Sequence, residues 1–164
     1  MTHFEGCPGS RMSEFKDNES QEETTGKVKS HLKQWPIQMH LISPMAPYYQ
    51  GADVLLTADC VAYALGGFHP DYLKGKSIGI ACPKLDEGQD IYLEKIKSWL
   101  EDAKINTLTV LIMQVPCCMG LLNLAQQAAR SSKRTVPIKC IVVGLQGEIL
   151  SEEWAVAEGT KKKE

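Results

Sequence analysis

The sequence predicts an α/β fold: a three-layer sandwich with a mostly parallel sheet of about five strands, Rossmann-like or flavodoxin-like in type. Short apolar and β-branched runs recur along the chain, and they are nearly continuous rather than alternating. Continuous runs are typical of strands covered on both faces, as in a parallel sheet. Amphipathic segments separate the runs, and this alternation predicts βαβ units with right-handed crossovers.

The runs expected to form strands are 37–43, 54–58, 77–82, 107–115 and 138–145. A Gly-containing turn at 144–148 joins the last of them to a short extension, Glu-Ile-Leu. A helix is expected over 86–104, where Tyr92, Ile96, Trp99, Leu100 and Ala103 form one apolar stripe. A second stripe predicts a helix over 118–131, and a short helix is expected over 61–65 before a turn at 69–76.

Composition divides the chain into one domain and two polar ends. Residues 1–33 are charged and lack periodicity, so they are expected to be a disordered tail or linker that contains Cys7. Residues 34–152 are expected to form the α/β domain, and residues 153–164 a loose C-terminal tail. The 164 residues suffice for one such domain.

Charge and hydropathy exclude several classes of protein. The net charge of -2 argues against a general nucleic-acid binder, which needs a basic surface. No apolar run approaches the ~20 residues needed to span a bilayer, and the N-terminus lacks the apolar core of a signal peptide. The sequence therefore predicts a cytoplasmic protein, in which cysteines are free, metal-bound or redox-active rather than paired in disulfides.

Four cysteines stand where predicted strands end. Cys60 follows the run 54–58, Cys82 ends the run 77–82, and Cys117 and Cys118 follow the run 107–115. The carboxyl ends of parallel strands share one edge of the sheet, where ligands bind, and neighbouring strands are ~5 Å apart. Four thiolates are typical ligands of iron–sulfur clusters and of structural zinc. The pattern predicts a soft-metal or redox site formed by these four residues.

Several neighbours are expected to support such a site. Cys118 lies near the start of a predicted helix, where the helix dipole should lower the pKa of its thiol. Lys84 should lower the pKa of the Cys82 thiol or offset cluster charge. His69 is a candidate ligand, proton donor or hydrogen-bond partner, and Asp59 a candidate for an outer hydrogen bond.

The spacing C-x21-C-x34-C-C is not a local metal motif, so two alternatives stay open. One is a cofactor-free docking or regulatory domain with buried thiols, and the other is a thiol-redox or zinc protein that uses the same cysteines. Asp86 either caps the helix at 86–104 or hydrogen-bonds near Cys82. Cys140 and His40, both inside expected strands, are interpreted as residues packed against the sheet. The chain has no P-loop, no G-x-G-x-x-G after its first strand and no G-x-S-x-G elbow.

The chain also carries the motifs WP-x-Q at 35–38, ADC at 58–60, FH at 68–69, CPKLD at 82–86 and VPCC at 115–118. Over about residues 33–150 it resembles a family of anaerobe iron–sulfur proteins labelled 4Fe-4S ferredoxins, in many of which this domain follows a ferredoxin module. The resemblance implies an iron–sulfur electron-transfer domain or accessory subunit with a ferredoxin-like or oxidoreductase partner, rather than a stand-alone enzyme. It leaves homo-oligomer formation open. The ferredoxin module's cysteine runs are absent here, and Met119 stands where family members have glycine.

Overall fold

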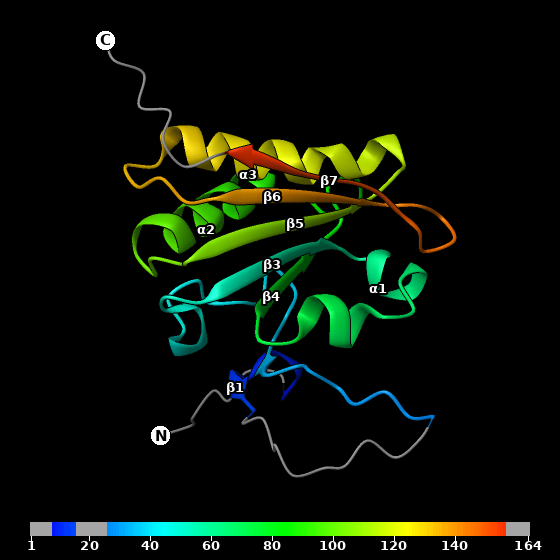
Figure 1. Cartoon of the computed structure of the whole chain (residues 1–164). Helices are drawn as coiled ribbons and strands as arrows, with labels where there is room; N and C mark the ends of the chain where they lie inside the picture. The colour runs from blue at the N-terminus through cyan, green and yellow to red at the C-terminus, as the bar shows by residue number, and fades with distance from the viewer. Residues whose placement is uncertain (1–7, 16–25, 157–164) are drawn as a thin grey trace.

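The computed structural model describes residues 8–15 and 26–156. Its centre is a five-stranded sheet with the order β4-β3-β5-β6-β7, in which only the last pair of strands is antiparallel (Figure 1). The strands are β3 (Asp53–Ala58), β4 (Ser77–Ala81), β5 (Thr107–Met113), β6 (Ile138–Val143) and β7 (Ile149–Val156). The expected α/β fold with a mostly parallel sheet is confirmed.

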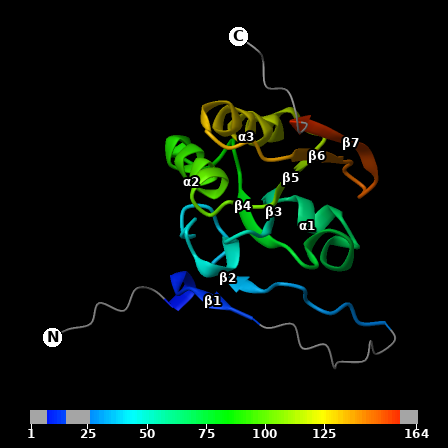
Figure 2. The ribbon, with the colours of Figure 1, turned by 60° about the vertical axis from the view of Figure 1, so that its left-hand side comes forward.

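Helices cover both faces of the sheet. The helices α2 (Gln89–Glu101) and α3 (Met119–Ser131) pack together on one face, while α1 (Val61–Ala64) and the π-helical turn η3 (Phe68–Leu73) lie on the other (Figure 2). The stripe predicted for α2 is buried as expected. Within the described residues, no helix is long and apolar enough to cross a membrane.

Gly79 in β4 allows α2 to approach the sheet closely. A Cβ placed at this residue would lie 2.7 Å from the ring of Trp99 and 2.7 Å from the sulfur of Met39. Both of these side chains are fully buried. A larger residue would force the core apart here, because protein interiors are too densely packed to absorb an added methyl group.

The strand expected at 37–43 does not form, and this prediction is wrong. The segment makes one parallel bridge to β4, between Gln38 and Ile80, and then turns away. The backbone N–H groups of Leu41 and Ile42 both bond to the carbonyl of Gln38, at 2.8 and 3.1 Å. The apolar pattern was correct about burial, since Met39 and Ile42 reach the core, but it did not indicate the turn.

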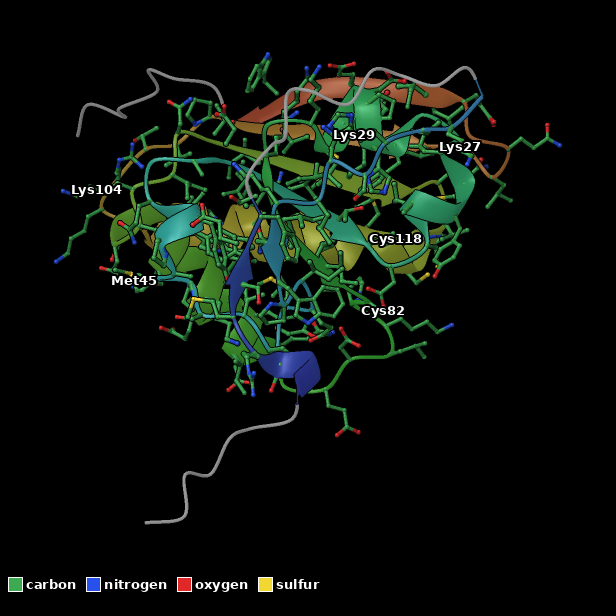
Figure 3. All side chains as sticks on the ribbon, turned by 90° about the horizontal axis from the view of Figure 1, so that it is seen from below. Lys27, Lys29, Met45, Cys82, Lys104 and Cys118 are labelled. Carbon is green, nitrogen blue, oxygen red and sulfur yellow. The ribbon has the colours of Figure 1, made fainter. Side chains whose placement is uncertain are left out.

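Both domain boundaries also differ from the prediction. At the N-terminal end, β1 (Ser13–Glu14) pairs with β2 (Gln34–Trp35), and the indole of Trp35 donates to the carbonyl of Gly9 at 2.7 Å. This pair lies below β4 in Figure 1 and in front of the domain in Figure 3. At the other end, β7 continues beyond residue 152 as an edge strand, because its backbone pairs with β6. Cys7 and the other residues of 1–7, 16–25 and 157–164 in the predicted tails lie outside the described residues.

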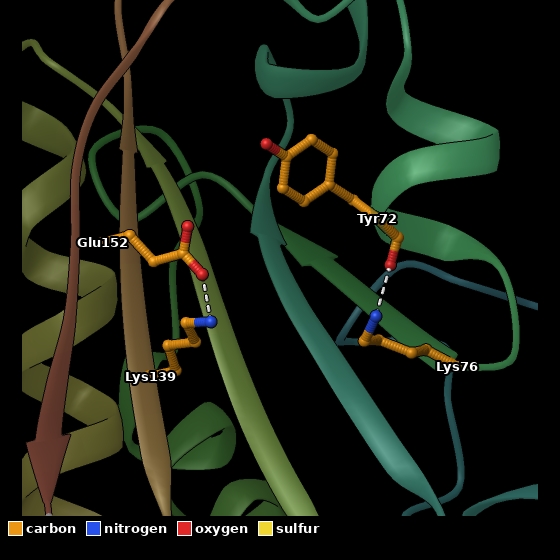
Figure 4. A network of polar contacts seen from close by, with 4 residues as sticks. All are labelled: Tyr72, Lys76, Lys139 and Glu152. Atoms are coloured by element: carbon orange, nitrogen blue, oxygen red, sulfur yellow. Dashed lines mark hydrogen bonds and ion pairs between the residues drawn. The ribbon is translucent and has the colours of Figure 1, made fainter.

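The sheet face that carries η3 is polar where it reaches β6 and β7. Lys139 of β6 forms an ion pair with Glu152 of β7, and Lys76 donates to the carbonyl of Tyr72 at 3.0 Å (Figure 4). Burial raises the pKa of the Tyr72 hydroxyl, and the carboxylates of Glu152 and Asp71 add to this. The polar part is limited to the region of this ion pair, because Leu111 of β5 and Ile141 of β6 are apolar and buried further along the same face. Ile78 and Ile80 of β4 line a pocket beneath α1 and η3.

Candidate functional site

The four predicted cysteines follow three adjacent parallel strands. In the sheet, β3 lies between β4 and β5, with Ala58 opposite Ala81 and Thr57 opposite Leu111. The loops that begin at residues 59, 82 and 114 therefore all leave the sheet at one edge. We call this the carboxyl edge. The three strands that precede the cysteines are therefore neighbours, as the predicted thiol site requires.

Close contacts join these loops to one another. The Cα of Gly120 approaches Pro83 so closely that an added Cβ would lie 3.0 Å from the proline ring, and the loop after β4 thus packs on the start of α3. The thiols of Cys117 and Cys60 are both near enough to the Cys118 thiol to raise its pKa. Figure 3 shows Cys82 and Cys118 in the same region of the molecule. Gly120 thus allows a close backbone approach although residue 119 is a methionine.

The cysteines of the edge differ in burial, and all are free thiols. Cys60 and Cys117 are exposed, Cys82 is partly buried and Cys118 is buried. Among residues 8–15 and 26–156, no three His, Cys, Asp or Glu side chains are arranged so that they could hold a single metal ion. The backbone therefore brings the thiols to one edge, but their side chains are not already arranged around one ion.

The pKa expected for Cys118 is wrong in direction. Cys118 does precede α3 as its N-cap, where the helix dipole favours an anion. Burial nevertheless raises the pKa of its thiol, against a hydrogen bond from the backbone of Met113 that lowers it. The nearby Cys117 and Cys60 raise it further. Desolvation of the thiolate therefore outweighs the favourable helix terminus.

Asp86 orders the loop that carries Cys82. Its carboxylate accepts hydrogen bonds from the backbone N–H of Cys82 at 2.9 Å, from Tyr92 Oη at 2.5 Å and from Gln38 Nε2 at 3.2 Å. The backbone N–H of Asp86 returns a bond to the Cys82 carbonyl at 2.9 Å. Of the two roles considered for Asp86, the structure shows the hydrogen bond beside Cys82, since Gly88 is the N-cap of α2.

The other residues predicted for the site, Asp59, Lys84 and His69, lie on three different segments of the chain. Asp59 lies at the end of β3, and burial raises the pKa of its carboxyl, with a further contribution from Asp86. Lys84 is exposed in the loop after Cys82. His69 is on η3, where its Nδ1 accepts a hydrogen bond from the backbone N–H of His31 at 3.0 Å. His69 and Asp59 both line a cavity of about 210 Å³ on the η3 face of the sheet.

The expectation that Cys140 and His40 pack against the sheet is confirmed for Cys140 and wrong for His40. Cys140 is buried in β6, as predicted. His40 is exposed instead, because it lies in the turn that replaces the expected strand. Its ring contacts that of Tyr92, with centroids 4.4 Å apart and the ring planes tilted by 44°. Its Nε2 lies 2.6 Å from the carbonyl oxygen of Glu87.

The roles of Tyr92 and Gln38 at the site were not anticipated from the sequence. Tyr92 was assigned to the core from its helical stripe, and Gln38 to a strand. The available signal was the hydroxyl of Tyr92, because a buried tyrosine hydroxyl usually needs a hydrogen-bond partner. The sequence did not indicate that this partner would be Asp86.

The fold and the edge define a doubly wound parallel α/β domain with thiols at the carboxyl ends of three strands. The chain belongs to a family described as a Rossmann-like domain, whose model matches residues 46–164. It is similar to an uncharacterized protein from Archaeoglobus fulgidus, with 28% identity over 120 residues, covering 72% of this chain and 82% of the relative. No solved structure matches the chain.

Proposed function

We propose that this domain binds an iron–sulfur cluster at the carboxyl edge and serves as an electron-transfer domain or accessory subunit of a cytoplasmic redox complex. The ligands would be Cys60, Cys82, Cys117 and Cys118. The observation that carries the proposal is the arrival of all four thiols at one sheet edge, from three adjacent strands whose loops touch.

The donor set fits a cluster better than a single ion. A tetrahedral zinc ion needs four sulfurs about 2.3 Å from one point, and the described residues offer no such group. The inorganic core of a cluster separates its ligands, so thiols on neighbouring loops suit it better. The adjacent cysteines Cys117 and Cys118 can also bind different iron atoms of one cluster.

The residues around the thiols would have distinct roles. When bound, the cluster supplies one-electron transfer. Asp86 holds the backbone of Cys82 in place, and Gly120 lets the Cys82 loop approach Cys118. Binding would replace the thiol protons, including that of Cys118, whose raised pKa makes this step easier at higher pH. The exposed Cys60 and Cys117 lie on the side open to a redox partner.

A thiol-redox function is the second candidate, and the contact between Cys117 and Cys118 favours it. The burial of Cys118 counts against it, because the thiolate is the reactive form and a raised pKa makes the thiolate scarce. A cofactor-free docking domain is the remaining alternative, and the same experiment distinguishes all three.

The test is an iron, zinc and acid-labile sulfide assay on the full chain, purified and reconstituted without oxygen. We expect iron and sulfide in equal amounts and broad absorption near about 400 nm. Cys82→Ser and Cys118→Ser should each lose most of the iron. Cys140→Ser is the matched control, since Cys140 is a buried cysteine in mid-strand, and it should retain the iron.

Other results would contradict the cluster. Stoichiometric zinc without sulfide would favour the zinc alternative. Metal-free protein that cycles between a Cys117–Cys118 disulfide and two thiols, by exchange with a small-molecule disulfide, would favour thiol redox chemistry. Metal-free protein with unreactive thiols would favour the docking domain.

A further inference from the structure

A cavity of about 210 Å³ lies between the sheet and the segments that cover its η3 face. Its floor is formed by Ile78 and Ile80 of β4, and its walls include Phe68 and Leu73 of η3 and Leu32 of the N-terminal segment. These side chains are carbon-rich. An apolar cavity of about 150 Å³ holds benzene, so this cavity has room for one aromatic ring with a small substituent.

The imidazole of His69 is a polar group held in a fixed position in the wall of the cavity. Because Nδ1 accepts the N–H of His31 at 3.0 Å, the neutral ring must carry its proton on Nε2. Nε2 has no hydrogen-bond partner within residues 8–15 and 26–156. The edge-on contact with Phe68, with centroids 5.7 Å apart, also holds the ring in place. His69 can thus donate one hydrogen bond to an acceptor in the cavity.

The charge around the cavity favours a neutral occupant. Burial lowers the pKa of His69, with a smaller contribution from His31, so the ring stays uncharged at neutral pH. This shift indicates surroundings that disfavour a cation. The carboxyl of Asp59 at the end of β3 would in addition repel an anion when it is ionised.

We propose that this cavity is a binding site for a small, neutral, mostly apolar molecule whose carbonyl or hydroxyl oxygen accepts the Nε2–H of His69. None of the four cysteines lines the cavity, and the proposed site does not depend on a cluster. A few placed polar groups in an apolar pocket typically set the orientation of a ligand and leave the affinity to apolar contact.

Three probes of similar size test the proposal in the metal-free full chain: acetophenone, ethylbenzene and benzoate. Binding is followed by NMR through the methyl groups of Ile37, Ile78 and Ile80, with Ile105 and Ile112 as distant references. We expect acetophenone to bind about three- to tenfold more tightly than ethylbenzene, as one additional hydrogen bond implies. Benzoate should not bind measurably at neutral pH.

Two variants and one control variant keep the test decisive. His69→Phe should reduce the affinity for acetophenone to that for ethylbenzene. Ala62→Trp, at an exposed position that lines the cavity, should abolish binding of both, whereas Glu94→Trp on α2 should not. Equal binding of acetophenone and benzoate, unchanged binding in Ala62→Trp, or shifts that favour the reference methyls would overturn the proposal.

Discussion

The side chain of Gln34 hydrogen-bonds to the backbone of Ile78 as a neighbouring strand would. Gln34 Oε1 accepts the N–H of Ile78 at 2.8 Å, and Gln34 Nε2 donates to the Ile78 carbonyl at 3.0 Å. Tyr49 Oη donates to the same carbonyl at 2.8 Å and accepts from Gln34 Nε2 at 2.7 Å. Gln34 is fully buried, and its amide satisfies the edge of β4 at Ile78, next to the bridge between Gln38 and Ile80.

Replacement of Gln34 by alanine should destabilise the domain by about 2–4 kcal/mol, because it leaves the N–H of Ile78 without its partner and creates a cavity. Urea unfolding followed by circular dichroism measures the change. Gln50→Ala is the matched control, since Gln50 is exposed and its side-chain amide donates to the carbonyl of Met45. Equal losses for the two variants would show that the amide does not support β4.

Asp86→Asn should loosen the loop of Cys82. The neutral amide keeps the shape of the side chain but loses the charge that strengthens three hydrogen bonds, so we expect a loss of about 1–3 kcal/mol in unfolding free energy. If the cluster is present, iron retention should fall as well. Asp102→Asn, which changes one exposed bond to Ser98, should cost less than about 0.5 kcal/mol. A wild-type iron content in Asp86→Asn would argue that Asp86 has no part in the site.

The thiols should differ in their rates of alkylation in metal-free protein. Cys60 and Cys117 are exposed, whereas Cys118 is buried and has a raised pKa. We expect iodoacetamide to modify Cys118 at least about tenfold more slowly than Cys60, as measured by tandem mass spectrometry of digested samples. Cys140, also buried with a raised pKa, is the internal reference for slow reaction. A Cys118 that reacts as fast as Cys60 would contradict the burial described for it.

The stability of the domain should depend on His69 as the pH falls. The pKa of His69 is lowered in the folded protein from its ordinary value of 6.5, so the unfolded chain binds a proton more readily. Protonation also removes the Nδ1 acceptor that holds the N–H of His31. The unfolding free energy should therefore decrease as the pH drops through the window below 6.5.

The difference between wild type and His69→Phe isolates this effect from the titration of carboxylates. Wild type should lose more stability than the variant between about pH 7.5 and about pH 5.5. An NMR titration of the His69 ring gives the pKa directly. Parallel pH profiles for the two proteins would refute the assignment.

The strands β3 to β6 were predictable because each is covered on both faces, so most residues of each run are buried and apolar. The same property misled the prediction at 37–43, where Met39 and Ile42 are buried in a turn. For β7 the opposite held, because Ser151, Glu152 and Glu153 interrupt the apolar residues of this edge strand. Backbone pairing with β6 determines that strand, and its sequence pattern does not show this.

The sequence by itself determined the fold class and the placement of four cysteines after three strands, because apolar period and chain order are local properties. Only the tertiary structure decided that those strands are adjacent, that Gly120 brings the Cys82 loop onto α3, and that burial outweighs the helix dipole at Cys118. It also decided that Gln34 completes the edge of β4, through a contact between residues 44 positions apart. Hydrogen-bond partners and desolvation depend on which distant segments meet, and no local pattern contains that information.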